Sequence, residues 1–340
     1  MRSLFSLLIM SCMAVTLIAQ APVQGGEVRL QFKTLRKPIY DLPTHAWKPV
    51  GTGIDVAARL GQRIAVQVKG TQLLVDGDGD GGFELRVEGT KPRTMTLTGK
   101  AGHPLRYAIS LVDKGGWKFR SACCLVAKVG DEIIRFFDQN SNGHFDDYGI
   151  DAVVVGRSRT ACFLSRILSI EGSLYEIELD DQGERLSYSP YKGDVGSLAV
   201  SVATKAKVLG AVIRSEDGKY SFELSRMASP IRLPVANYEL YSGTIGLGAN
   251  RVEVKEGTYP AINVQEGVHS DINWGGPVRA DFTYLRAGKE LQLSPKTIRY
   301  YGKSGEEYHS WYPDGKSPRI VIDNGKTGRQ IAEAYFPGTC

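Results

Sequence analysis

The chain has 340 residues, with 42 Lys or Arg and 37 Asp or Glu, so its formal net charge at pH 7 is +5. This charge is small and dispersed, without a run of five or more like charges, which argues against a nucleic-acid-binding protein. The length exceeds one typical domain and allows a sizeable core.

Residues 1–25 are typical of a secretory signal peptide. Arg2 precedes an uncharged apolar run at 4–19, which is the pattern of such a peptide. Cleavage after Ala21 or after Gly25 fits this pattern, while a lipoprotein signal and an uncleaved anchor are less favoured alternatives. We therefore expect a secreted, periplasmic or cell-surface protein with no membrane span in the mature chain.

Apolar and polar residues alternate in nearly every ordered stretch that follows. Clear examples lie at 64–68, 83–87, 105–111, 174–179, 220–224 and 252–254. Side chains two residues apart share one face of a strand, so this period indicates half-buried strands. Turn sequences separate the strands at short spacing, and only a short helix near 55–60 is expected. The sequence predicts an all-β fold, with two or three β-sandwich domains in tandem after the signal peptide.

We divide the mature chain into three parts. Residues 26–195 form a β domain with two acidic loops, residues 196–268 a compact β-sandwich, and residues 269–340 a small, immunoglobulin-like β unit. The last two parts are also compatible with one continuous sandwich.

The middle part has a recognisable pattern at three places. These are Gly210-Ala-Val-Ile213, Asp217-Gly-Lys-Tyr-Ser-Phe222 and Ile231-Arg-Leu-Pro-Val-Ala-Asn-Tyr238. The pattern resembles the transthyretin-like, carboxypeptidase-regulatory type of β-sandwich. This resemblance covers about seventy residues and implies that fold for 196–268.

The first acidic loop is Asp76-Gly-Asp-Gly-Asp-Gly-Gly-Phe-Glu84, between two apolar stretches. Oxygen-bearing side chains at positions 1, 3 and 5, followed by glycine at position 6, suit Ca²⁺, which takes six to eight oxygens. Position 12 is Val87 and no helix pattern flanks the loop, so it is not an EF-hand. The alternative is an acidic hairpin turn.

This loop resembles the non-helical Asp-x-Asp-x-Asp-Gly calcium loops of dockerins, thrombospondin repeats and exported proteins of the bacterial envelope. The resemblance implies side-chain oxygens from Asp76, Asp78 and Asp80, the backbone carbonyl of Gly82 and a carboxylate from Glu84. Three aspartates within five residues repel one another unless a cation compensates. We therefore expect this loop to be ordered only with its ion.

The second loop is Asp138-Gln-Asn-Ser-Asn-Gly-His-Phe-Asp-Asp147, again between two strand-like stretches. Its predicted ligands are Asp138, Asn140, Asn142, the carbonyl of His144, Asp146, Asp147 and Asp151. Asparagines keep the oxygens and lower the charge, so we expect this loop to hold its shape better without calcium. The alternative is a long Asx-rich turn.

Four cysteines follow the signal peptide: Cys123, Cys124, Cys162 and Cys340. An exported chain with an even count favours disulfides. Because neighbouring residues of a strand point to opposite faces, Cys123 and Cys124 are the least expected pair. We predict a disulfide between Cys162 and either Cys123 or Cys124.

The aromatic cluster Tyr300, Tyr308, Trp311 and Tyr312 has two interpretations. Exposed rings on a β-sandwich would bind carbohydrate, whereas rings at period two also pack a core, and we favour the core. The five histidines lack metal-ligand spacing and Gly-x-Ser-x-Gly is absent, so an enzyme is not indicated.

Together these features predict a secreted, non-enzymatic β protein with calcium-stabilised loops and a structural or adhesive role in the bacterial envelope. Its partner would be an envelope polysaccharide or protein. The alternative is a carbohydrate-binding or carbohydrate-processing protein that uses the aromatic cluster.

Overall fold

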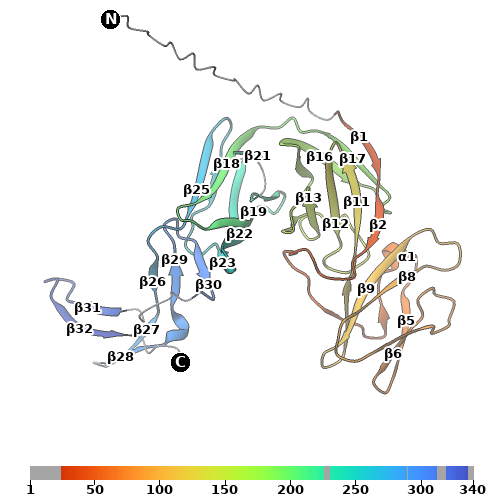
Figure 1. The fold of residues 1–340 in the computed structure, drawn as a ribbon, viewed down its shortest axis with the longest axis horizontal. Coiled ribbons are helices and arrows are strands. Elements are labelled where there is room, and N and C mark those ends of the chain that lie inside the picture. The colour runs from red at the N-terminus through yellow and green to blue at the C-terminus, as the bar shows by residue number, and fades with distance from the viewer. Residues whose placement is uncertain (1–23, 226–229, 289, 312–318, 336–340) are drawn as a thin grey trace, which may run out of the picture.

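The computed structural model describes residues 24–225, 230–288, 290–311 and 319–335, and its strands are arranged in two regions (Figure 1). The predicted all-β fold is confirmed, because strands form nearly all of the regular structure. The predicted short helix is present as α1 (Ala57–Leu60), and a 3-10 helix spans Pro295–Thr297. In the described part of the chain, neither helix approaches the ~20 residues that a membrane span requires. The predicted signal peptide, apart from its last two residues, lies outside the described residues.

The N-terminal region contains four antiparallel sheets. One has the order β1 (Gly26–Arg29), β17 (Arg185–Pro190), β16 (Ser173–Leu179) and β15 (Ile167–Ile170). The next has the order β14 (Cys162–Phe163), β13 (Ala152–Val155), β12 (Glu132–Phe137), β11 (Cys123–Val129) and β2 (Gln31–Thr34). A third has the order β3 (Lys48–Pro49), β10 (Trp117–Ser121), β9 (Arg106–Asp113) and β8 (Arg93–Thr98). The fourth has the order β4 (Gly53–Ile54), β5 (Ile64–Lys69), β6 (Gln72–Val75) and β7 (Leu85–Glu88).

Strand β9 lies at the centre of this region. Its residues from Tyr107 to Val112 are all buried, whereas alternation in the sequence predicted that only one face would be. The strand contacts α1, β2, β7 and β11 from other layers, so both of its faces are covered. Its side chains join a core cluster of buried residues that runs from Leu30 to Leu186 and also includes Val212.

The C-terminal region contains two larger sheets and two hairpins. One sheet has the order β21 (Ile231–Pro234), β18 (Val195–Val202) and β25 (His269–Trp274). The other has the order β20 (Ser221–Glu223), β19 (Lys207–Ser215), β22 (Ala236–Leu247), β23 (Asn250–Lys255), β30 (Glu307–His309), β29 (Arg299–Tyr301) and β26 (Arg279–Asp281), with β24 (Ile262–Val264) also paired to β22. The hairpins are β27 (Tyr284–Ala287) with β28 (Glu290–Leu293), and β31 (Arg319–Asp323) with β32 (Gln330–Tyr335).

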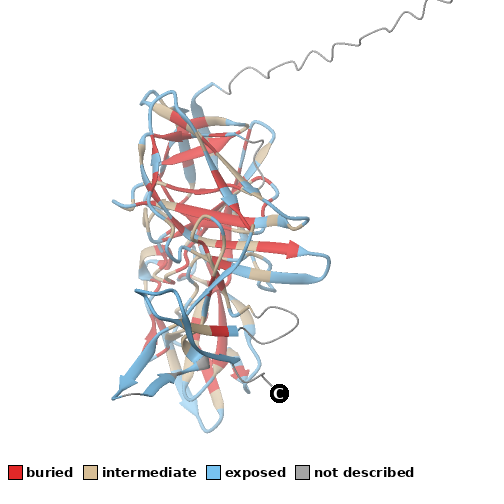
Figure 2. Ribbon diagram, turned by 90° about the vertical axis from the view of Figure 1, so that its left-hand side faces the viewer, coloured by how far each residue is buried: buried red, intermediate tan, exposed pale blue. Residues whose placement is uncertain are grey.

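The core of this region continues across position 268, where we divided the sequence. Strand β18 pairs with β25, and β23 pairs with β30, so segments from both sides of the division share sheets. Trp274 is fully buried, and a Cβ at Gly243 would lie 2.5 Å from its ring. Figure 2 shows the buried strands within the body of the molecule, while β27 and β32 are exposed along their whole length.

The two regions meet where β14 lies beside β19 and β20. The backbone N–H of Phe163 donates to Ser221 Oγ at 3.2 Å. Arg214 places its guanidinium 4.5 Å from the centre of the Phe163 ring and donates to the carbonyl of Gly149 at 3.0 Å. These contacts connect the end of the second acidic loop to the C-terminal region.

The predicted disulfide is absent, because Cys123, Cys124 and Cys162 are buried free thiols. Cys162 lies on β14, three strands away from β11 in the same sheet. Neighbouring strands are about 4.8 Å apart, so the two strands are separated by roughly 14 Å. A disulfide requires Cα atoms within about 7 Å. Cys340 lies outside the described residues.

Candidate cation-binding loops

The first acidic loop connects β6 to β7 in an antiparallel hairpin, with Val75 opposite Leu85. Asp76 is buried at the start of the loop, where Oδ1 accepts from the N–H of Gly79 at 2.7 Å and Oδ2 from that of Gly81 at 3.2 Å. Both glycines have left-handed φ angles of +72° and +94°, which L side chains rarely adopt. The local sequence therefore folds the loop around the Asp76 carboxylate.

Four carboxylates gather in this loop. Asp76, Asp78, Asp80 and Glu84 each offer one oxygen, and these oxygens all lie within 4.8 Å of one another. Within the described residues, no ion pair compensates any of the four. Clustered carboxylates repel one another, and hard cations prefer oxygen ligands. The group is therefore able to hold a metal ion.

Backbone groups orient the other carboxylates. Asp80 Oδ1 accepts from the N–H of Gly82 at 2.6 Å, and Glu84 Oε1 accepts from the N–H of Gly77 at 2.6 Å. Gln62, which precedes β5, donates from Nε2 to the carbonyl of Asp78 at 3.4 Å. Gln62 was not predicted, because it lies 16 residues from its partner in the sequence.

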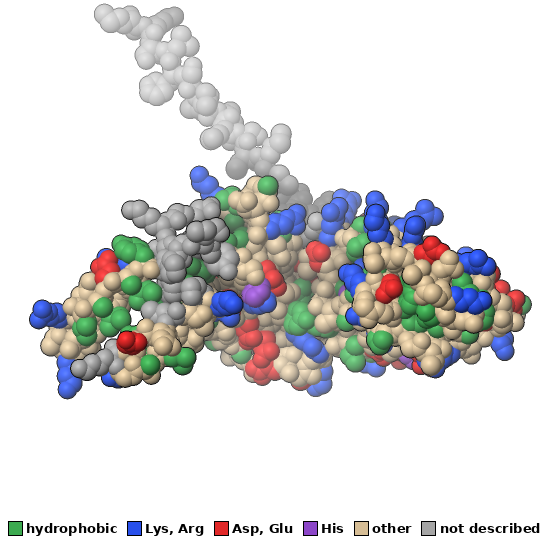
Figure 3. Space-filling model, turned by 90° about the horizontal axis from the view of Figure 1, so that it is seen from below, with side chains coloured by type: hydrophobic (Ala, Val, Ile, Leu, Met, Phe, Trp, Pro, Cys, Tyr) green, Lys and Arg blue, Asp and Glu red, His purple; other side chains and the backbone are tan. Residues whose placement is uncertain are grey.

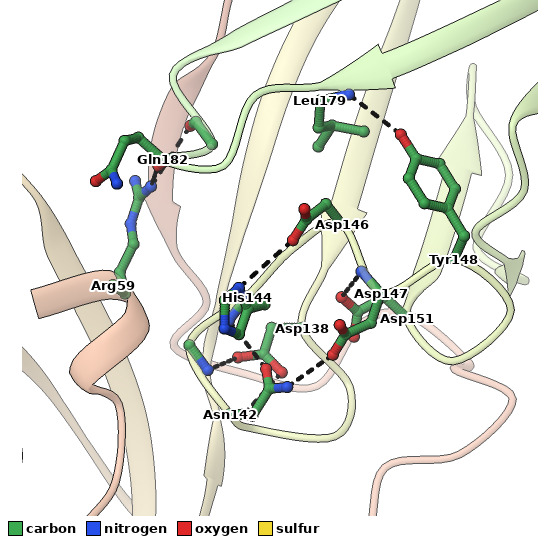
Figure 4. A network of polar contacts seen from close by, with 12 residues as sticks. Arg59, Asp138, Asn142, His144, Asp146, Asp147, Tyr148, Asp151, Leu179 and Gln182 are labelled. Carbon is green, nitrogen blue, oxygen red and sulfur yellow. Dashed lines mark hydrogen bonds and ion pairs between the residues drawn. The ribbon is translucent and has the colours of Figure 1, made fainter.

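The second loop connects β12 to β13, most of its residues are buried or half-buried, and Figure 4 shows the polar contacts among its side chains. Asp138 is 1% exposed, and its Oδ2 accepts from the hydroxyl of Tyr107 at 2.6 Å and from the N–H of Gly143 at 2.7 Å. Asp151 is fully buried and accepts from the N–H groups of Gln139 and Asp147, both at 3.2 Å. Tyr107 was not predicted, because β9 precedes the loop by about thirty residues.

Two asparagines and Asp147 form the centre of this loop. The Nδ2 groups of Asn140 and Asn142 both donate to Asp147 Oδ2, at 2.8 and 2.7 Å. Among the described residues, Asn140 Oδ1 is one of few buried side-chain atoms with no hydrogen-bond partner. Asp146 instead lies 3.6 Å from the ring of His144 toward the surface. The structure thus brings together Asp138, Asn140, Asn142, Asp147 and Asp151.

Burial dominates the electrostatics of the second loop. It raises the pKa of Asp138 above the usual range, against hydrogen bonds from Tyr107 and Gly143 that lower it. It also raises the pKa of Asp151, and the negative charges of Asp138 and Asp147 add to that increase. Removing carboxylates from water disfavours their charged form, and a nearby cation favours it.

The second loop packs against α1. Arg59 is buried, donates to the carbonyl of Gln182 in the turn between β16 and β17, and lies 5.6 Å from the centre of the Phe145 ring. Phe145 in turn contacts Tyr107, with ring centres 6.2 Å apart. The loop is therefore enclosed between α1, β9 and the β16–β17 turn.

The C-terminal aromatic cluster belongs to the core. Tyr300 and Tyr308 are 6% and 8% exposed, and Trp311 packs edge-on against their rings at 5.4 and 5.7 Å. These three rings do not form an exposed sugar-stacking face, and Tyr312 lies outside the described residues. Figure 3 shows Lys and Arg side chains spread along one face of the molecule with acidic side chains between them.

Comparisons with known proteins give no match to a family model, a curated protein or a solved structure.

Proposed function

We propose that the chain is a secreted, non-enzymatic β-sandwich protein with a structural or adhesive role in the bacterial envelope, and that its acidic loops bind calcium. The observation that carries this proposal is the group of four carboxylates, Asp76, Asp78, Asp80 and Glu84, gathered within 4.8 Å without a basic partner. A divalent cation is the simplest compensation for such a charge.

The mechanism is thermodynamic linkage. A cation that binds only the folded loops stabilises the protein by about RT ln(1 + [L]/Kd). Extracellular calcium modules function with Kd values as weak as ~10⁻⁴–10⁻³ M, because calcium is plentiful outside cells. The ion would stiffen the β6–β7 hairpin, whose turn holds mutually repelling carboxylates.

The donor set of the second loop also fits a cation. Asn140 Oδ1 is buried without a hydrogen-bond partner, close to the Asp147 carboxylate. Rotating either asparagine amide by half a turn would replace a nitrogen beside Asp147 with an oxygen. The loop would then offer amide oxygens together with the carboxylates of Asp138 and Asp147. His144 and Gly82 remain predicted carbonyl ligands.

Thermal unfolding of metal-free protein tests the proposal. We expect added CaCl2 to raise the midpoint and chelator to reverse the increase. The double variant Asp78→Asn/Asp80→Asn should lose most of the response, whereas Asp131→Asn, an 82% exposed carboxylate elsewhere, should keep it. An unchanged midpoint with and without calcium, in protein verified to be metal-free, would contradict the proposal.

A further inference from the structure

A cavity of about 720 Å³ lies between the two regions. Its walls come from β15, β16 and β17 on one side and from the turn between β19 and β20 on the other. Ligand pockets typically measure about 300–1,000 Å³ and often occur at domain junctions. The cavity is separate from the carboxylate group of the first loop and from the buried aspartates of the second.

Three half-buried tyrosine rings border the cavity: Tyr148, Tyr191 and Tyr220. The hydroxyl of Tyr148 accepts from the N–H of Leu179 at 3.2 Å, and the Arg166 guanidinium lies 4.2 Å from its ring centre. Tyr188 also borders the cavity, but it pairs with Ile177 and its ring packs edge-on against the buried Tyr175, on the face of the sheet opposite Glu176 and Glu178. The contacts of Tyr148 with Leu179 and Arg166 hold its ring in place before any ligand binds, which lowers the entropic cost of binding.

The charged side chains that line the cavity differ in whether they form an ion pair. Lys219 and Asp217 form an ion pair of 2.9 Å at the tip of the β19–β20 turn. Glu176 and Glu178 are exposed and lie two residues apart on β16, so they share one face of the strand. In the described part of the chain, neither glutamate belongs to an ion pair. Their carboxylates are therefore available to accept hydrogen bonds from a ligand.

We propose that this cavity binds a short neutral oligosaccharide. Tyrosine rings offer flat apolar area with a polar edge, which suits the C–H face of a pyranose, and carboxylates accept hydrogen bonds from its hydroxyl groups. Three acidic side chains against two basic ones line the cavity, which disfavours an anionic sugar. This inference goes beyond the proposed cation binding and does not depend on it.

The test begins with the full mature chain on an array of neutral, amino and uronic-acid oligosaccharides, with choline as a separate probe. The neutral oligosaccharide retained most strongly is then titrated by calorimetry into three variants. Tyr191→Ala removes a ring and Glu178→Gln removes a charge at constant shape. Tyr284→Ala is the matched control, because this tyrosine is 59% exposed on β27, away from the cavity. Thermal unfolding of each variant verifies its fold.

We expect retention of a neutral oligosaccharide, with binding weakened about tenfold or more by Tyr191→Ala and by Glu178→Gln and unchanged in the control. If Tyr191→Ala does not fold, the isosteric Glu178→Gln still decides the question. Retention of only uronic-acid sugars or only choline would overturn the ligand class. No binding to any neutral sugar, or binding unaffected by both cavity variants, would overturn the site.

Discussion

The two acidic loops share a sequence pattern but differ in how the protein surrounds them. The first extends from a hairpin, with Asp80 and Glu84 exposed and four carboxylates in close proximity. The second is enclosed by α1, β9 and the β16–β17 turn, with Asp138 and Asp151 buried and held by hydrogen bonds. Similar ligand patterns therefore occur both in an open cluster of carboxylates that could hold a metal ion and in an enclosed hydrogen-bonded network.

The comparison shows what determines dependence on a cation. At Asp138, backbone N–H groups and Tyr107 offset part of the cost of burying the carboxylate, because hydrogen bonds favour the ionised form, although burial still raises its pKa. In the first loop, only Asp76 is buried, whereas Asp78 is half-buried and Asp80 and Glu84 are exposed. We therefore expect the first loop to respond more strongly to calcium and the second to respond more strongly to mutation.

The largest expected effect is from Asp138→Ala. This change leaves the Tyr107 hydroxyl and the N–H of Gly143 without their buried acceptor, so we expect a loss of roughly 3–5 kcal/mol in the free energy of unfolding. Asp78→Ala in metal-free protein should cost less than about 1 kcal/mol, because it also relieves repulsion. Urea unfolding in chelator measures both. Equal losses would show that the second loop is not the better supported of the two.

A second comparison uses the glycine at position 6 of each loop. Gly81 and Gly143 have similar φ angles, +94° and +91°, so alanine is strained at both. A Cβ at Gly81 meets nothing within 4 Å, whereas one at Gly143 would lie 3.2 Å from the backbone of Val56 and Arg59. We expect Gly81→Ala to cost about 1 kcal/mol and Gly143→Ala about 2–3 kcal/mol. Equal costs in urea unfolding would contradict the close packing of the second loop against α1.

Much of this contrast between the two loops could be predicted from the sequence, and the predictable features are those that lie within a short stretch of the chain. Alternating oxygen donors and glycine lie within ten residues, so both loops and their flanking strands could be predicted. The hydrogen bond from the Tyr107 hydroxyl to Asp138 could not be predicted, because it depends on which strand passes behind the loop. The asparagines of the second loop predict a lower dependence on metal, whereas the enclosure of this loop by Arg59 and Phe145 had no signal in the sequence.

The disulfide prediction was wrong for the same reason, because it depended on how distant segments of the chain are arranged. Strand geometry predicted that the side chains of Cys123 and Cys124 point to opposite faces, and these residues do lie in different core clusters. The order of strands in the sheet, which separates β11 from β14, does not follow from alternation. For the aromatic cluster, the period of two fitted both an exposed face and a core, and only the burial of Tyr300 and Tyr308 distinguishes them.

Hydrogen exchange in metal-free protein compares the loops at the level of local opening. We expect residues 76–84 to exchange faster than residues 138–147, because repelling carboxylates loosen the first turn. Calcium should slow exchange mainly in the first segment. Protection of 76–84 without calcium that equals protection of 138–147 would invalidate the ranking.

The smallest expected effect is on the thiol beneath the second loop. Cys123 is buried on β11, and its Sγ lies 3.7 Å from Ser121 Oγ. Burial raises the pKa of Cys123 to about 12, so the folded protein carries almost no thiolate there at pH 8. An unfolded cysteine ionises near pH 8.5, so this burial contributes stability that is complete below about pH 8.5 and is lost as the pH rises toward 12.

At pH 8 we expect slow labelling of Cys123 by a thiol reagent, measured by site-resolved mass spectrometry, at nearly the same rate with calcium and with chelator. Faster labelling in chelator would mean that the second loop opens when the cation is removed, and that the two loops depend on it alike.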